Sequence, residues 1–174
     1  ITINGINVAN LTPEQAKLAL SQTAQDQEGE FLITLTFAGR EEKVKASLFG
    51  VSPNVDETIR KAMLLTRTGG IGDREEAMGN AEPTAFNLEI TYDDATLEDS
   101  IRNAIPQLNL APVEPHVEVN MAVEGSFDFV EGKPGIQVNE DEFVKKIAET
   151  VRSGNFTGTI EVPGEITQPT YTID

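Results

Sequence analysis

Two stretches of the chain carry the same pattern of apolar and polar positions, and each pattern predicts a helix. Residues 50–69 and 135–154 align without a gap at an offset of 85 residues, and seven of the 20 paired positions are identical. Ordinary residue usage would give only about one identity. The identical pairs are Gly50/Gly135, Asn54/Asn139, Asp56/Asp141, Glu57/Glu142, Lys61/Lys146, Arg67/Arg152 and Gly69/Gly154. We therefore interpret the chain as an internal duplication.

Each repeated stretch contains the signals that start and end a helix. An asparagine stands at the N-cap position, and a glutamate three residues later completes a predicted capping box. Apolar residues then recur at helical spacing, and a final glycine can adopt the left-handed conformation that ends a helix. The cap, box and stop residues are Asn54, Glu57 and Gly69 in the first copy and Asn139, Glu142 and Gly154 in the second. The apolar stripes are Ile59, Ala62, Met63 and Thr66 in the first copy and Val144, Ile147, Ala148 and Val151 in the second.

The rest of the chain alternates between short predicted strands and two further helices. The helices begin after Thr12 and Thr96 and end near Ser21 and Pro106, and a polar loop is expected at 22–29. The predicted strands are 1–3, 30–38, 43–49, 86–91, 116–123, 126–130, 157–162 and 165–172. The order strand, helix, hairpin, helix in each half predicts an α+β fold of antiparallel sheets with helices packed on one side. We take residues 1–85 and 86–174 as two similar halves.

Composition excludes several classes of protein. The chain carries 13 basic and 29 acidic residues, for a net charge of −16, which disfavours nucleic acid and anionic membranes as partners. Cysteine is absent, which excludes disulfides and thiolate chemistry. No apolar run approaches the roughly 18 residues of a membrane helix, so we expect no membrane insertion. Because the chain starts without methionine, inside a predicted strand, we expect it to be a piece of a longer protein.

No set of residues predicts catalysis or a metal site. His116 is the only histidine, which argues against a histidine-rich metal site and against a nucleophilic triad. The acidic runs 93–94 and 140–142 carry ligands suited to a hard cation, but no calcium-loop motif is present and helix capping explains the second run. We therefore expect no enzyme activity, no metal and no cofactor.

Several short segments resemble one family. Residues 3–16 read INGINVANLTPEQA, which resembles the opening NG-(I/V)-x-V-x-x-(L/M)-T-x-E-x-A of peptidoglycan-binding domains in bacterial cell-wall proteins. Further similar segments are Ala62-x4-Arg67-x-Gly69, the run FDFVEGKPGIQVNEDE at 127–142, and the close at 160–163 and 169–172. The sequence departs from the usual pattern at 116–119, where a segment of small residues is more common.

The resemblance implies a location and a role. Domains of this family precede VanW-type or L,D-transpeptidase catalytic domains, and neither the transpeptidase cysteine motif nor a VanW domain is found in this chain. The resemblance thus implies a non-catalytic, extracytoplasmic module of a Gram-positive cell-wall protein, in the wall or at a membrane-anchored cell surface. It would bind peptidoglycan or its peptide stems and would be covalently linked to other domains. The alternative is a spacer or protein–protein interaction domain without wall affinity.

Two arginines and a tyrosine are the candidate ligand-binding residues. Arg67 and Arg74 flank the glycine-rich start of the segment 69–85, and guanidinium groups suit the carboxylates of peptide stems. Helix capping is the alternative explanation for Arg67, and a solvated loop charge is the alternative for Arg74. Tyr92 is one of only two tyrosines, and tryptophan is absent. Because the phenylalanines mostly follow core-like patterns, we expect recognition of peptide stems rather than stacking on sugar rings.

Overall fold

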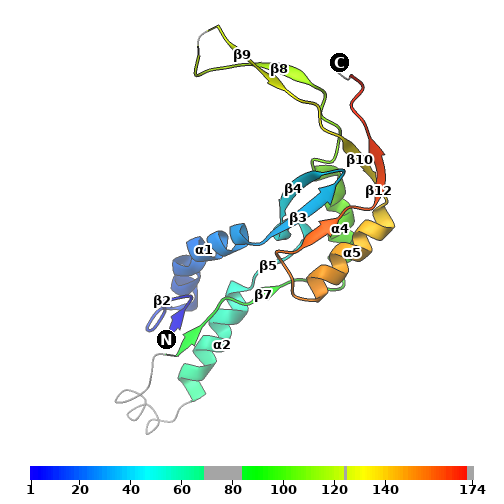
Figure 1. Ribbon diagram of the computed structural model, residues 1–174. Helices are drawn as coiled ribbons and strands as arrows, with labels where there is room; N and C mark the ends of the chain where they lie inside the picture. Colours follow the sequence, from blue (N-terminus) through cyan, green and yellow to red (C-terminus); the bar gives the residue numbers. More distant parts are fainter. Residues whose placement is uncertain (69–83, 124, 172–174) are drawn as a thin grey trace. The chain divides into compact units, whose positions relative to one another are not determined.

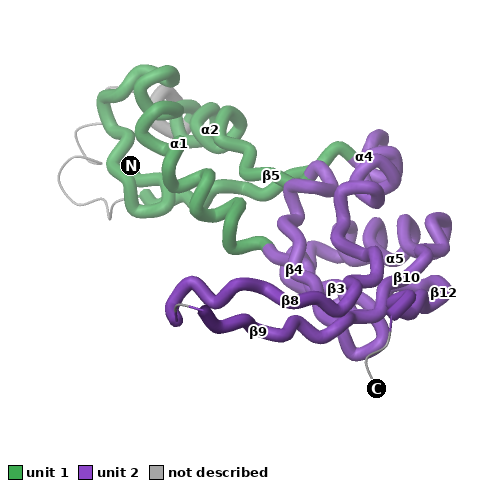
Figure 2. The backbone as a smooth tube through the Cα atoms, turned by 90° about the horizontal axis from the view of Figure 1, so that it is seen from above, with its two compact units in different colours: residues 1–31, 51–93 green, residues 32–50, 94–174 purple. Residues whose placement is uncertain are grey.

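The structure, a computed structural model, describes residues 1–68, 84–123 and 125–171, without the side chains of residues 65–68. The chain forms two compact units, which Figure 2 shows in green and purple. Unit 1 comprises residues 1–31 and 51–93, and unit 2 comprises residues 32–50 and 94–174. Neither unit is continuous in sequence, because residues 32–50 leave unit 1 to become part of unit 2.

The described part of unit 1 is built from two helices and five short strands. Its elements are β1 (Thr2–Ile3), β2 (Ile6–Asn7), α1 (Pro13–Glu30), β5 (Ser52–Pro53), α2 (Val55–Thr68), β6 (Ala85–Phe86) and β7 (Ile90–Thr91). β1 pairs antiparallel with β2 and parallel with β6, and β5 pairs antiparallel with β7. Helices α1 and α2 pack on each other. The core of the unit is formed by Ile3, Val8, Ala16, Leu20, Ile59, Ala62 and Leu88.

Helix α1 starts as predicted but extends well beyond its predicted end. Thr12 Oγ1 accepts from the N–H of Gln15 at 3.2 Å, and Gln15 Oε1 accepts from the N–H of Thr12 at 2.9 Å, which closes the capping box. The predicted polar loop at 22–29 is wrong, because these residues are helical. Gln27 in the added turns donates to the carbonyl oxygen of Leu88 and accepts from Asn4. Contacts that are distant in sequence thus stabilise a polar stretch as helix.

Unit 2 contains the sheet with the longest strands among the described residues. Its elements are β3 (Leu32–Phe37), β4 (Arg40–Lys45), the 3₁₀ helix η1 (Ala46–Phe49), α4 (Leu97–Ala104), the 3₁₀ helix η2 (Ile105–Gln107), β8 (His116–Val119), β9 (Phe127–Val130), β10 (Gly135–Val138), α5 (Glu140–Arg152), β11 (Thr159–Glu161) and β12 (Gly164–Thr167). β3 pairs antiparallel with β4 and parallel with β11 (Figure 1). β10 pairs with β12, β8 pairs with β9, and α4 packs on α5.

The two units use the same pairing scheme. In each, the first strand of a hairpin lies between its hairpin partner and a parallel strand: β1 lies between β2 and β6, and β3 lies between β4 and β11. In each, the strand before the second helix pairs antiparallel with the last strand, as β5–β7 and β10–β12. The α+β class is confirmed, although two of the pairings are parallel. The unit boundaries fall inside each of the halves 1–85 and 86–174, so these halves remain an interpretation of the sequence.

The helix signals of the repeat are confirmed for the described residues, with one correction. Asn54 accepts from the N–H of Glu57 at 3.1 Å, and Asn139 accepts from the N–H of Glu142 at 3.5 Å. The predicted return bonds from the two glutamates are wrong, because each asparagine N–H instead donates to the carbonyl of the residue directly before a strand, β7 or β12. The acceptors are Glu89 for Asn54 (2.7 Å) and Pro163 for Asn139 (2.9 Å). Gly154 has the predicted positive φ of 78°, and Gly69 lies outside the described residues.

Two strand predictions are also wrong. The predicted single strand at 86–91 is split into β6 and β7, which belong to different sheets. The predicted strand at 43–49 is displaced, because β4 begins at Arg40 and the chain turns into η1 at Ala46. In both places the hydrogen bonding of the backbone changes within a few residues, from one sheet to another or from a strand to a 3₁₀ helix. Side-chain alternation alone carries no signal of such a change.

Candidate functional site

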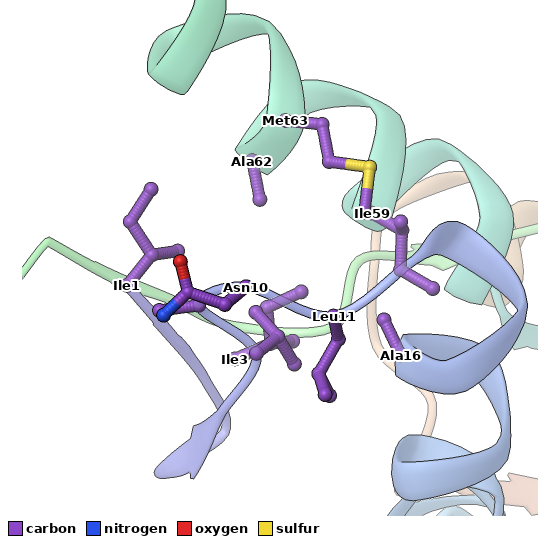
Figure 3. Close-up of a pocket in the computed structure, with 10 residues that line it drawn as sticks. Ile1, Ile3, Asn10, Leu11, Ala16, Ile59, Ala62 and Met63 are labelled. Carbon is purple, nitrogen blue, oxygen red and sulfur yellow. The ribbon is translucent and has the colours of Figure 1, made fainter.

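The described part of unit 1 contains a small apolar pocket beside α2. The cavity measures about 70 Å³ and is lined chiefly by aliphatic side chains, with Asn10 as the polar member (Figure 3). Ile3, Leu11, Ile59 and Met63 contribute from β1, the segment just before α1 and one side of α2. A cavity of this size is well below the roughly 300 Å³ of an ordinary small-molecule site and suits a small aliphatic group better than a sugar ring.

A second depression adjoins this pocket and carries charged groups. Ile59 and Met63 line both hollows, and Asp56 and Arg60 are added in the second. Asp56 forms an ion pair with Lys17, and Arg60 donates from Nε to Glu57 at 2.7 Å. The hydrogen bond and charge of Glu57 raise the pKa of Arg60. We call the two hollows together the α2 groove; both signs of charge flank its apolar floor.

The structure gives only partial information on the three predicted site residues. Tyr92 is half-buried and directly follows β7 in unit 1. Arg67 belongs to the last turn of α2, and its side chain is not described. Arg74 lies outside the described residues, as does the glycine-rich segment 69–83. The site formed by Arg67, Arg74 and Tyr92 therefore stays a prediction.

The expectation that the phenylalanines lie in the core is wrong at two positions. Phe127 and Phe129 of β9 are 66% and 55% exposed, and Val117 and Val119 of β8 are 61% and 63% exposed. The alternation of these four residues with polar ones is visible in the sequence and is typical of a half-buried strand. Nothing in the alternation reveals whether another element covers the apolar side.

The acidic runs that the sequence offered as cation ligands are paired with arginines. Asp94 accepts from Nε of Arg152 at 2.7 Å, and Asp141 accepts from Arg102 at 3.1 Å. Among the described residues no group of three or more histidine, aspartate or glutamate side chains is arranged to hold a metal ion. None of the helices in the described part of the chain combines the length and apolar character needed to span a membrane.

Both ring nitrogens of His116 contact residues two positions away in the sequence. Its Nδ1 lies 2.9 Å from the carbonyl oxygen of Glu114, and its Nε2 lies 3.0 Å from Oε1 of Glu118. The contact with the Glu114 carbonyl, and then that with Glu118, raise the pKa of the imidazole. Both ring nitrogens thus have local partners, which is the arrangement of a structural histidine.

Comparison with known families identifies the class of the chain. The profile of the family described as "Putative peptidoglycan binding domain" matches residues 42–158, which is more than half of the chain. The chain belongs to this family. No curated protein and no solved structure matches it. The assignment supports a cell-wall binding module and implies association with the cell wall. The matched region starts in β4 and ends just before β11, so it includes parts of both units.

Proposed function

We propose that this chain is a non-catalytic module of an exported Gram-positive cell-wall protein and that it binds peptidoglycan. The observation that carries the proposal is the family match over residues 42–158. Covalently linked domains of the full-length protein, of VanW or L,D-transpeptidase type, would be held at the wall by this binding.

The α2 groove supports the peptide stem as the recognised part. Stem peptides offer methyl side chains together with carboxylate and ammonium groups. The small aliphatic pocket at Ile59 and Met63 fits a methyl group, and the neighbouring Asp56 and Arg60 match charges of both signs. Arg67 follows Met63 by one turn of the same helix. We propose that Arg67, Arg74 and Tyr92 extend this groove and bind stem carboxylates.

The test is co-sedimentation of the chain with purified peptidoglycan sacculi at low and moderate salt. We expect saturable binding that survives moderate salt and weakens several-fold in Arg67→Ala and in Arg74→Ala. Arg152→Ala is the matched control, because Arg152 is the repeat counterpart of Arg67 and pairs with Asp94 and Glu98 in unit 2.

The outcomes separate the function from the site. Binding that both arginine variants retain would support the function and remove the proposed site. An equal loss in the Arg152 control would indicate a general effect of charge. Absence of binding at every salt concentration would overturn wall binding by this chain and favour the spacer or protein-interaction alternative.

A further inference from the structure

The hairpin β8–β9 presents an apolar face that no described residue covers. Val117 lies opposite Phe129 and Val119 lies opposite Phe127, so these four exposed side chains form one contiguous surface. We call it the hairpin face. Figure 1 shows the two strands extending away from the helices of unit 2. An isolated two-stranded hairpin is marginally stable in water, and a third strand or a packing partner is what normally stabilises it.

The other hairpins of this chain indicate which edge accepts a further strand. β1 and β3, the first strands of their hairpins, each carry a parallel third strand on the outer edge. The second strands, β2 and β4, remain at the edge of their sheets. β8 is the first strand of its hairpin, and among the described residues its sheet has only two strands. The internal precedent therefore selects β8 rather than β9.

The backbone of β8 has the groups that such a strand requires. Asn120 N–H donates to the carbonyl oxygen of Ser126 at 3.0 Å, so the pair before it, Val119 and Phe127, is a non-hydrogen-bonded pair. By alternation the N–H and C=O groups of Val117 and Val119 face the outer edge.

In β3 the groups at the outer edge already bond the added strand. The N–H of Thr34 donates to Gly158 at 2.9 Å, and the carbonyl of Thr36 accepts from Val162 at 2.9 Å. Val117 and Val119 of β8 present the same spacing of backbone groups, two residues apart on one strand.

The polar face of the hairpin carries an unfavourable charge pair. Glu118 and Asp128 lie directly opposite each other, and like charges in this position destabilise a sheet. Their hydrogen-bond partners are His116 and Asn120, and no described lysine or arginine pairs with either carboxylate. Residues 114–133 contain five acidic residues and one basic residue. A cation from a partner would relieve this repulsion.

We propose that the outer edge of β8 is a docking site for an extended, basic polypeptide segment that adds a strand parallel to β8. The segment has the pattern apolar–basic–apolar. Its apolar side chains lie beside Val117 and Val119 and enlarge the hairpin face, and its lysine or arginine lies beside Glu118. This is a protein-recognition function, and it does not depend on wall binding.

The test uses the peptide acetyl-Lys-Thr-Val-Lys-Val-Thr-Lys-amide and the isotopically labelled 174-residue chain in NMR titrations. We expect saturable shifts and slower hydrogen exchange at the amides of Val117 and Val119. A peptide with glutamate at the central position should bind several-fold more weakly, and an N-methylated peptide should not bind. Glu118→Lys should weaken binding several-fold. Glu41→Lys is the matched control, because Glu41 is an exposed carboxylate on β4, the second strand of its hairpin.

Three results would overturn the proposal. The first is the absence of saturable shifts at β8 at millimolar peptide. The second is equal binding of the lysine and glutamate peptides, which would remove the charge recognition. The third is concentration-dependent protection of β8 without peptide, because the occupant would then be a second copy of the chain. The Glu118→Lys variant is also tested for co-sedimentation with sacculi, so that a loss of peptide binding can be distinguished from a loss of wall binding.

Discussion

Hairpins β3–β4 and β8–β9 belong to the same unit and show the same alternation of apolar residues, but only one is covered. The apolar residues of β3 (Ile33, Leu35 and Phe37) are buried, whereas those of β8 are exposed. β3 also has β11 as a third strand, and β8 has none among the described residues. The comparison teaches that alternation of apolar and polar residues predicts a strand surface that can be buried. Whether that surface is buried depends on elements that are far away in the sequence and pack against it.

The tip of β3–β4 is also anchored by a buried arginine, which has no counterpart among the described residues of β8–β9. The guanidinium of Arg40 is buried and donates to the carbonyl oxygens of Asn109, Ala111 and Pro134 at 2.9, 2.9 and 3.2 Å. It also donates from Nε to Glu42 at 2.7 Å. One arginine therefore fixes the hairpin to the segments before α5. Near the tip of β8–β9, the side chain of Asn120 bonds to Asp128 and Ala122, which are the partners it has among the described residues, and both belong to the same hairpin.

The largest predicted effect is the difference between matched truncations in the two hairpins. Leu35→Ala removes a buried side chain and should lower the free energy of unfolding by about 3 to 4 kcal/mol. Val119→Ala should change it by less than about 0.5 kcal/mol, since the side chain is exposed. Urea unfolding followed by circular dichroism measures both. A loss above about 1 kcal/mol for Val119→Ala would show that something covers β8 within this chain.

Replacement of Arg40 should lower the free energy of unfolding nearly as much as Leu35→Ala. Arg40→Met keeps the length of the side chain but leaves three carbonyl groups without their donor, so we expect a loss of about 3 kcal/mol. Arg102→Met is the control, because Arg102 forms exposed ion pairs with Glu140 and Asp141, which contribute little. Thermal melting of the two variants compares them. Equal melting temperatures would contradict the assignment of Arg40 as an anchor.

Gly135, which follows the hairpin β8–β9, and its repeat counterpart Gly50 differ in what an added side chain would meet. A Cβ on Gly135 would overlap the backbone of Ala111 and Pro112, whereas a Cβ on Gly50 would make only an ordinary contact with Ser100, and Gly50 has a φ of 82°. Gly135→Ala should therefore lower the free energy of unfolding by about 2 kcal/mol through overpacking, and Gly50→Ala by about 1 kcal/mol through backbone strain. Chemical denaturation of both variants tests the order, and the reverse order would disprove it.

These glycines also show how far the sequence could predict the fold. The pair Gly50 and Gly135 was found from identity alone, but identity does not reveal that one glycine serves a φ angle and the other a close approach. Helix starts at Thr12, Asn54 and Asn139 were predictable because caps depend on neighbours within four residues. The last turns of α1 were not, because Gln27 is held by residues that are distant in sequence.

The sequence predicted the family of the chain but not the geometry of its candidate site. Short turns and caps were enough for the family, because they are local features of the sequence. The α2 groove depends on packing of β1, α1 and α2, which no local pattern specifies. The hairpin face was visible as alternation at Val117 and Val119, but its exposure was not.

The smallest predicted effect is a pH dependence confined to the base of β8–β9. The Glu114 carbonyl and the Glu118 carboxylate raise the pKa of His116 above its ordinary value near 6.5. Its contribution to hairpin stability is therefore complete below pH 6.5 and is lost as the pH rises through the folded pKa.

The pKa of Glu114 shifts in the opposite direction, because its carboxylate accepts from the N–H groups of Thr170 and Tyr171. The contribution of Glu114 to hairpin stability is present at pH values above the ordinary pKa of glutamate and is lost as the pH falls through the lowered pKa. Together the two groups make the hairpin base most stable in weakly acidic solution.

The single histidine makes this window directly measurable. The ring protons of His116 should titrate above pH 6.5 in NMR spectra, and cross-strand contacts in β8–β9 should weaken over the same range. Glu118→Gln should lower the pKa only in part, because the bond to the Glu114 carbonyl remains. In β3–β4, whose strands contain no histidine, the same contacts should stay constant. A His116 pKa at or below 6.5 would mean that the imidazole does not hold the base of the hairpin in solution.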